Sequence, residues 1–123
     1  MTHGKQVLDE LREPAAALRA LIPDVYAGFS QTYKSALGDG SLDAKTKELI
    51  ALGISVSQQC DGCIASHARG AAMKGATLEE AAEAIGVSIL MSGGPATVYG
   101  PRAFAAFTEF YERAQQRTQP PQG

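Results

Sequence analysis

The feature that most constrains the fold is the absence of a partner for the one strand-like stretch in the sequence. Between residues 52 and 57, large apolar residues alternate with glycine and serine, as they would in a half-buried strand. No second strand candidate occurs elsewhere in the 123 residues, and a strand without a neighbour is not stable. We therefore interpret this stretch as part of a helix and predict an all-α fold.

The rest of the sequence carries helix start and stop signals that predict a bundle of about six helices joined by short turns. Asp43 is the expected N-cap of the helix that contains the strand-like stretch, and Thr77 with Glu80 forms the capping-box pattern of a later helix. Pro14 is expected to interrupt the first helix. The expected helices cover approximately residues 5–21, 23–37, 44–57, 60–75, 78–92 and 95–115.

The length of 123 residues fits one helical domain, which we expect to span residues 1–123. Its motif-bearing core is expected at about 40–99, and a loose tail at 115–123. From residue 84 to residue 101 the chain carries no charged side chain, but glycines and a proline break this stretch. We interpret it as the junction of two helices or as an oligomer interface, and not as a membrane span, and we expect a homo-oligomer.

The charge of the chain is nearly balanced, at −2, and the sequence contains no run of basic residues. Surfaces that bind nucleic acid or anionic membranes need concentrated lysine and arginine, so we expect neither partner. The N-terminus, MTHGKQVLDELREP, has charges where a signal peptide has an apolar core, so we expect a cytoplasmic protein. In a reducing cytoplasm, two cysteines three positions apart indicate reactivity or metal binding more than a permanent crosslink.

The stretch that carries chemistry is SQQCDGCIASHARG, residues 57–70, which holds the only two cysteines of the chain. Cys60, Cys63 and His67 are three and four positions apart, so they share one face of a helix. Two cysteines at this spacing can form a disulfide without refolding the helix, and a helix N-terminus favours the thiolate. His67 could accept the proton of Cys63. The pattern therefore predicts a reactive dithiol.

Glu48 is the expected partner of His67. In one continuous helix, Glu48 would lie about 18 Å from Cys60, which is too far for contact. A chain reversal at residues 57–59 would make two antiparallel helices and place Glu48 opposite His67. The helical face of Glu48 is otherwise small or apolar, so its carboxylate should point inward, where it needs a partner. We expect a proton relay of Glu48, His67 and a cysteine.

Less specific interpretations stay open at each position. Glu48 could instead form a surface ion pair with Lys45, one helical turn earlier. His67 could be a core histidine with satisfied hydrogen bonds, and the cysteines could be small buried apolar residues. Cys60, Cys63 and His67 also supply three of the four ligands that a structural zinc site needs.

Three segments extend the pattern well beyond a CxxC motif: LDAKTKELIALGISV, CDGCIASHARGAAMKGAT and EEAAEAIGVSILMSGGPATVYG. In them a glutamate precedes the CxxC by twelve positions, and a histidine follows the second cysteine by four. This combination resembles the carboxymuconolactone decarboxylase-like superfamily, specifically its alkyl hydroperoxide reductase D-like branch. The resemblance covers about half of the chain. It implies an all-helical fold that assembles into trimers or hexamers, and thiol-dependent reduction of peroxides.

The resemblance also implies a role for each site residue. Cys63 corresponds to the peroxidatic cysteine, Cys60 to the resolving cysteine, and Glu48 with His67 to the proton relay. In the best-known hydroperoxidases of this branch a histidine precedes the second cysteine, whereas Gly62 stands there in this chain. The decarboxylases that give the superfamily its name lack the cysteine pair.

The peroxidase chemistry that the resemblance implies requires no metal, flavin or nicotinamide, and the sequence contains no Gly-rich phosphate loop after a strand. The expected partners are a hydroperoxide substrate and an external dithiol, for which the resemblance suggests a lipoyl-type or thioredoxin-like donor. Three alternatives are a general disulfide oxidoreductase, a decarboxylase-like lyase and a non-enzymatic oligomeric redox sensor.

Overall fold

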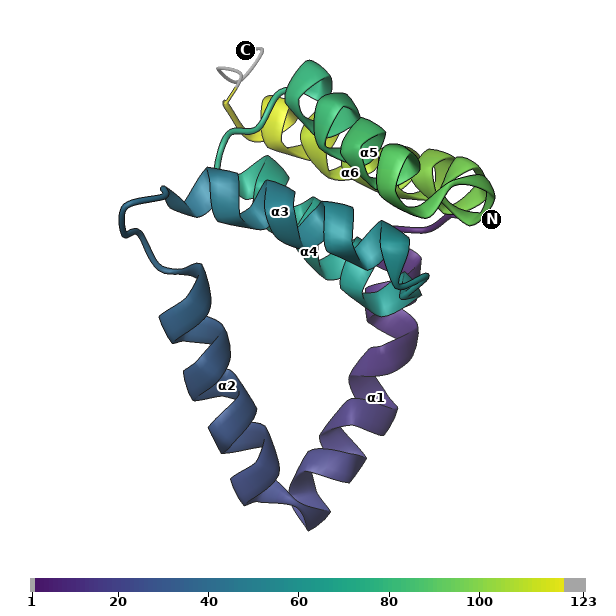
Figure 1. The fold of residues 1–123 in the computed structure, drawn as a ribbon. Helices are drawn as coiled ribbons and strands as arrows, with labels where there is room; N and C mark the ends of the chain where they lie inside the picture. The colour runs from purple at the N-terminus through teal and green to yellow at the C-terminus, as the bar shows by residue number, and fades with distance from the viewer. Residues whose placement is uncertain (1, 119–123) are drawn as a thin grey trace, which may run out of the picture.

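Six α-helices account for the regular secondary structure of residues 2–118, the part of the chain that this computed structural model describes (Figure 1). No strand occurs in that part, and the strand-like stretch at 52–57 is helical. The all-α prediction is therefore confirmed. The helices are α1 (Lys5–Leu21), α2 (Pro23–Leu37), α3 (Ala44–Ser57), α4 (Asp61–Met73), α5 (Leu78–Ser92) and α6 (Gly94–Thr118).

The helix-start signals in the sequence act as expected. The side chain of Asp43 accepts a hydrogen bond of 2.8 Å from the backbone N–H of Thr46, which caps α3. Thr77 and Glu80 form a complete capping box at the start of α5, in which each side chain accepts from the backbone N–H of the other residue. These caps satisfy N–H groups that the first turn of a helix leaves without a partner.

Two expectations about the extent of the helices differ from the structure. Helix α1 continues through Pro14, where an interruption was expected, because the proline is exposed and water can satisfy the carbonyl that loses its helical donor. Helix α6 continues to Thr118, so residues 115–118 of the expected loose tail are helical. The remaining tail residues, 119–123, lie outside the described part of the chain.

Helix α4 packs against α3 and α6, and α5 packs on both α3 and α6, so these four helices enclose the core. In Figure 1, α5 and α6 form one layer above the pair α3 and α4. Most buried core residues are alanines, which lets the helix backbones approach closely, and Phe107 of α6 is the largest of the fully buried side chains. The core consists of Leu52, Val56, Ile64, Ala68, Ala71, Ala72, Ala76, Ala81, Ile85, Ala96, Ala103, Ala106, Phe107 and Phe110.

A tight reversal between α3 and α4 makes these two helices antiparallel neighbours. Gln59 has a left-handed backbone conformation, with φ of 56°, and its N–H donates to the carbonyl of Val56. The N–H of Cys60 donates to the carbonyl of Ser55. This pair of bonds is the Schellman motif, which stops a helix and turns the chain back, and glycine usually occupies the left-handed position. The reversal expected at residues 57–59 is present.

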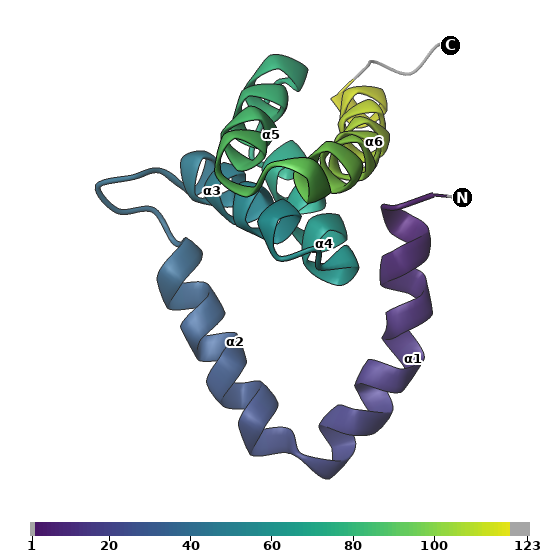
Figure 2. The same cartoon turned by 45° about the vertical axis from the view of Figure 1, so that its right-hand side comes forward.

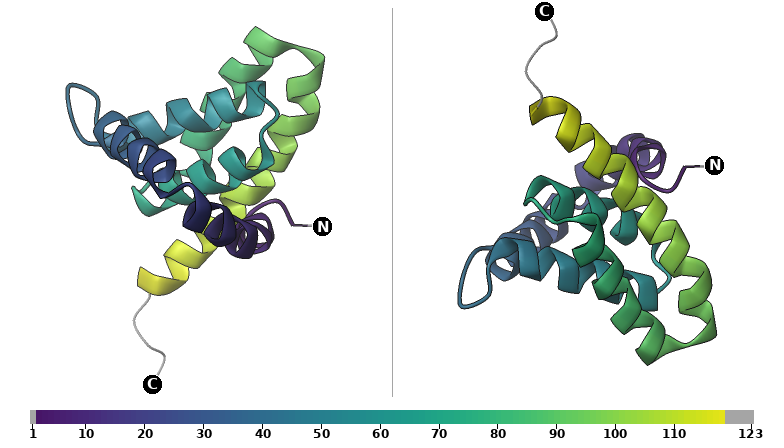
Figure 3. Two further views of the ribbon diagram at one scale, coloured as in Figure 1. Left: turned by 90° about the horizontal axis from the view of Figure 1, so that it is seen from below. Right: turned by 90° about the horizontal axis from the view of Figure 1, so that it is seen from above.

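Helices α1 and α2 do not pack into a six-helix bundle, which corrects the expected arrangement. They form a V-shaped arm that extends away from α3–α6 (Figures 1 and 2). No residue of α1 or α2 is buried. The sequence predicted amphipathic helices here, but their apolar side chains, such as Leu21, Val25 and Phe29, remain exposed in this chain. Figure 3, left, looks onto the arm from the side opposite α5 and α6.

Within the described residues, no helix is both long enough and apolar enough to span a bilayer. The uncharged stretch at 84–101 instead forms the end of α5, the turn at Gly93 and the start of α6.

Candidate active site

Cys60 and Cys63 form a disulfide at the N-terminus of α4, with their Cα atoms 5.2 Å apart. Cys60 is the N-cap residue, and its sulfur accepts a hydrogen bond of 3.3 Å from the backbone N–H of Cys63. Both cysteines are partly exposed, so they are not buried apolar side chains of the core. The N–H groups of the first helical turn, together with the helix dipole, favour a thiolate at this position when the pair is reduced.

Glu48 lies against His67, as the helix reversal predicts. The carboxylate oxygen Oε2 of Glu48, on α3, is 2.9 Å from Nδ1 of His67, on α4. Glu48 is buried, with 6% of its surface exposed, so the imidazole is the partner that its carboxylate needs. In the tautomer that carries its proton on Nδ1, His67 donates to Glu48 and leaves the lone pair on Nε2 available as a base.

Gly70, which was not among the expected site residues, makes this contact possible. A Cβ atom at Gly70 would lie 2.5 Å from the carboxyl carbon of Glu48 and 2.5 Å from Oε2, closer than such atoms can approach. Gly70 follows His67 by three positions and shares its helical face. Its position could have identified it, because it is a glycine on the face of α4 that was expected to receive the carboxylate of Glu48.

The alternative roles of these residues can now be compared with their contacts. Lys45 pairs with Glu80 of α5 at 2.9 Å and not with Glu48. That ion pair raises the pKa of Lys45 and lowers the pKa of Glu80, because each charge stabilises the other. In the described residues, no group of three or more histidine, cysteine, aspartate or glutamate side chains is arranged to hold a metal ion.

Each helix of the arm places one side chain against the site. The ring of Tyr33, on α2, stacks on the imidazole of His67, with ring centroids 5.9 Å apart and planes 15° from parallel. On α1, a methyl group of Leu11 lies 3.1 Å from the position that a Cβ atom would take at Gly62. The space beside Gly62, between the two cysteines, is therefore taken by Leu11. No local pattern in the sequence predicts either contact, because α1 and α2 lie far from α4 along the chain.

The structure does not join all four expected residues into one hydrogen-bonded chain. Glu48 contacts His67, and Cys60 contacts Cys63, but within residues 2–118 no hydrogen bond connects the imidazole to either sulfur. His67 follows Cys63 by one helical turn on the same face of α4, so a water or a substrate oxygen between them would complete the connection.

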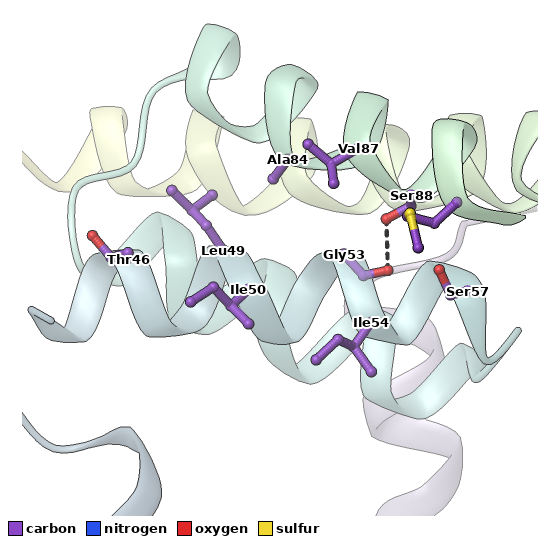
Figure 4. Close-up of a pocket in the computed structure, with 10 residues that line it drawn as sticks. Thr46, Leu49, Ile50, Gly53, Ile54, Ser57, Ala84, Val87 and Ser88 are labelled. Atoms are coloured by element: carbon purple, nitrogen blue, oxygen red, sulfur yellow. Dashed lines mark hydrogen bonds between the residues drawn. The ribbon is translucent and has the colours of Figure 1, made fainter.

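A separate apolar groove of about 460 Å³ lies between α3 and α5 (Figure 4). Ile50 and Ile54 of α3 and Val87 of α5 line it, and the Ser88 hydroxyl donates a hydrogen bond of 2.7 Å to the Gly53 carbonyl across it. None of its lining residues is charged, and none of the four expected site residues lines it. The groove therefore offers a contact surface and no acid, base or nucleophile of the kind found at the disulfide.

Comparison with known proteins agrees with this architecture. The model of the carboxymuconolactone decarboxylase family matches residues 23–109. An uncharacterized protein of Cupriavidus necator is 38% identical over 86% of this chain and 94% of its own length. Uncharacterized protein 4 in the cox locus of Paracoccus denitrificans is 39% identical over 73% of this chain and 78% of its own length. The crystal structure of a carboxymuconolactone decarboxylase family protein from Legionella pneumophila superposes with a TM-score of 0.81, at 40% identity, over 84% of this chain and 92% of that one.

The close approach at Gly70 generates a test with a matched control. Gly70→Ala should lower the free energy of unfolding by about 1–3 kcal/mol, because the added methyl group overpacks the Glu48 carboxyl. Gly86→Ala, on α5, places the same methyl group where no atom lies within 4 Å. It should raise the free energy of unfolding by roughly 0.5–1 kcal/mol through helix propensity. Urea titration measures both, and equal effects of the two variants would contradict the close contact.

The stacking of Tyr33 on His67 generates a second test. Tyr33→Leu should lower the free energy of unfolding by about 0.5–1.5 kcal/mol and should shift the NMR signals of the His67 ring, because the aromatic ring is lost. Tyr33→Phe keeps the ring and should leave both quantities nearly unchanged. A Phe variant that behaves like the Leu variant would assign the effect to the hydroxyl group and would refute the stacking.

Proposed function

Since the chain belongs to the carboxymuconolactone decarboxylase family, which includes enzymes, we propose that it is a thiol-dependent peroxidase of the alkylhydroperoxidase type. The observation that carries the proposal is the Cys60–Cys63 disulfide, which lies one helical turn before a histidine held by a buried glutamate. In this proposal the disulfide is the oxidised form of a catalytic dithiol. A hydroperoxide is the substrate, and an external dithiol or lipoyl-type donor is the reductant.

The first step uses the reduced pair. His67, oriented by Glu48, accepts the proton of Cys63 at Nε2, directly or through a water. The Cys63 thiolate attacks one oxygen of the hydroperoxide, and the O–O bond breaks. The sulfur becomes a sulfenic acid, and the departing alkoxide takes up the proton to leave as an alcohol. The N–H groups at the start of α4 favour the thiolate before the attack.

The second step closes the disulfide. The Cys60 thiol attacks the sulfenic sulfur of Cys63, the S–O bond breaks, and water leaves with the thiol proton. The hydrogen bond from the Cys63 N–H to the Cys60 sulfur keeps the two sulfurs together at the helix N-terminus. A cysteine pair with this Cα separation can therefore cycle between both states without refolding α4.

The third step returns the pair to the dithiol. One thiolate of an external dithiol attacks a sulfur of the disulfide, and its second thiol completes the exchange, so that the donor leaves oxidised and the pair is reduced. The sulfur of Cys60 accepts an N–H hydrogen bond, which makes it the better leaving group. Attack of the donor on Cys63 is therefore favoured, and both halves of the cycle act on that sulfur.

Gly62 and Leu11 shape the approach to the sulfurs. Since a methyl group of Leu11 lies 3.1 Å from the position of a Cβ at Gly62, a larger side chain there would press against Leu11. The protein thus has an apolar side chain where related hydroperoxidases carry an imidazole, and His67 is left as the base.

Assembly into a trimer or hexamer is part of the proposal. The arm leaves Leu21, Val25 and Phe29 exposed, and the groove between α3 and α5 leaves Ile54 and Met91 exposed. Contiguous apolar surface of this kind is usually covered in an oligomer.

Cysteine substitution tests the catalytic proposal. Wild-type protein should consume an organic hydroperoxide continuously in the presence of dithiothreitol, whereas Cys63→Ser should lose turnover. In the absence of any dithiol, Cys60→Ser should react once and retain a sulfenic acid on Cys63, which mass spectrometry detects after reaction with a sulfenic-acid-specific reagent.

The outcomes separate the proposal from its alternatives. Faster turnover with disulfides than with hydroperoxides would identify a general disulfide oxidoreductase. A single oxidation without turnover by the wild type would identify a redox sensor. Activity on a lactone acid that survives Cys63→Ser would identify a lyase. Peroxide turnover that neither substitution changes rules out the cysteine mechanism.

Light scattering tests the assembly. The wild type should have the mass of three or six chains, and Met91→Asp should lower that mass, because a buried carboxylate without a partner is costly. Leu42→Asp is the matched control, because Leu42 is also exposed but lies outside the groove and the arm. A monomeric wild type, or an unchanged mass of the Met91→Asp variant, contradicts assembly through the groove.

A further inference from the structure

A second cavity, of about 180 Å³, lies between α1, α4 and α6, and its lining is strongly basic. Five of the chain's 11 lysine and arginine side chains line it, although the net charge of the chain is −2. These residues are far apart along the chain, so they form no run of basic residues in the sequence. The fold brings them together, and the cationic side chains are Lys5, Arg12, Arg69, Arg113 and Arg117.

Each of the three helices contributes basic side chains to the lining of the cavity. These are Lys5 and Arg12 from α1, Arg69 from α4, and Arg113 and Arg117 from α6. Residues at such spacings of four and seven share one face of a helix. The apolar floor, as we call the uncharged part of the lining, consists of Leu8, Met73, Phe110 and Ala114.

Only part of this positive charge is neutralised inside the protein. Asp9, the one carboxylate among the lining residues, pairs with Lys5 and with Arg12. The hydrogen bond from Lys5, and the charges of Lys5, Arg12 and Arg113, lower the pKa of Asp9. Arg113 also lies 3.9 Å from Glu109. Within residues 2–118, no ion pair engages Arg69 or Arg117.

We propose that this cavity binds a small anion that carries a phosphate group, held between Arg69 of α4 and Arg117 of α6. The planar guanidinium group presents paired N–H donors that match phosphate oxygens, and such charge-assisted bonds are stronger than neutral ones. A cavity of about 180 Å³ has room for a phosphate and a short substituent, which the apolar floor would contact. Dinucleotides and large lipids are too big for it.

The cavity is distinct from the disulfide site. Arg69 follows His67 by two positions on α4, which places the two side chains on different faces of the helix. None of the four residues of the disulfide site lines the cavity. The proposal therefore does not depend on the peroxidase mechanism.

Calorimetric titration of the full chain with sodium phosphate tests the site, at pH 7 and at an ionic strength held constant with sodium chloride. The wild type should give saturable binding. Arg69→Gln and Arg117→Gln should each weaken that binding about tenfold, because each removes a charge-assisted hydrogen bond. Arg102→Gln is the control: it removes the same charge from α6, but Arg102 stacks on Tyr99 and does not line the cavity.

NMR of the unmodified protein gives a second measurement that needs no variant. Phosphate should shift the amide signals of α1, α4 and α6 around the cavity at concentrations at which chloride does not. Tighter binding of phenyl phosphate than of inorganic phosphate would identify the ligand as a phosphomonoester. The opposite order of affinities would identify it as the free phosphate ion. The absence of saturable binding, shifts spread over the whole chain, or equal weakening by Arg102→Gln overturns the proposal.

Discussion

The contact between Glu48 and His67 is the interaction on which the rest of the site depends. A buried carboxylate is costly unless it has a partner, and the imidazole at 2.9 Å is that partner. The contact joins α3 to α4 across the reversal at Gln59, so it also fixes which face of α4 is turned toward α3. With His67 held on that face, Cys63 lies one turn earlier on the same face. The burial of one charge therefore helps to orient the face of α4 that carries His67 and Cys63.

Two glycines of α4 create the space that this arrangement needs. Gly70 leaves room for the carboxyl group of Glu48, and Gly62 leaves room for Leu11 of the arm. Glycine inside a helix lowers its stability, so both positions trade helix propensity for close approach. The consequences differ. A side chain at position 70 would collide with the carboxyl group of Glu48, whereas one at position 62 would press against a methyl group of Leu11.

The sequence predicted local features well and distant contacts poorly, for physical reasons. Capping signals depend on residues three positions apart, so Asp43 and Thr77 marked their helices correctly. The pairing of Glu48 with His67 was also predictable, since one tight turn separates their helices. In contrast, Tyr33 and Leu11 reach the site from helices whose positions depend on tertiary packing. Their amphipathic patterns predicted an apolar contact but could not predict which surface would supply it, and in this chain most of that apolar face remains uncovered.

Helix α1 is shared by the disulfide site and by the basic cavity, and this gives the two sites a physical link. Leu11 contacts Gly62 between the cysteines, while Lys5 and Arg12, on the same helix, line the cavity. Because α1 has no buried residue, few contacts resist its displacement. An anion held between α1, α4 and α6 would restrain the helix that contacts Gly62. Thermodynamic linkage then requires the reverse effect as well, so that any redox state in which α1 lies closer to α4 binds the anion more tightly.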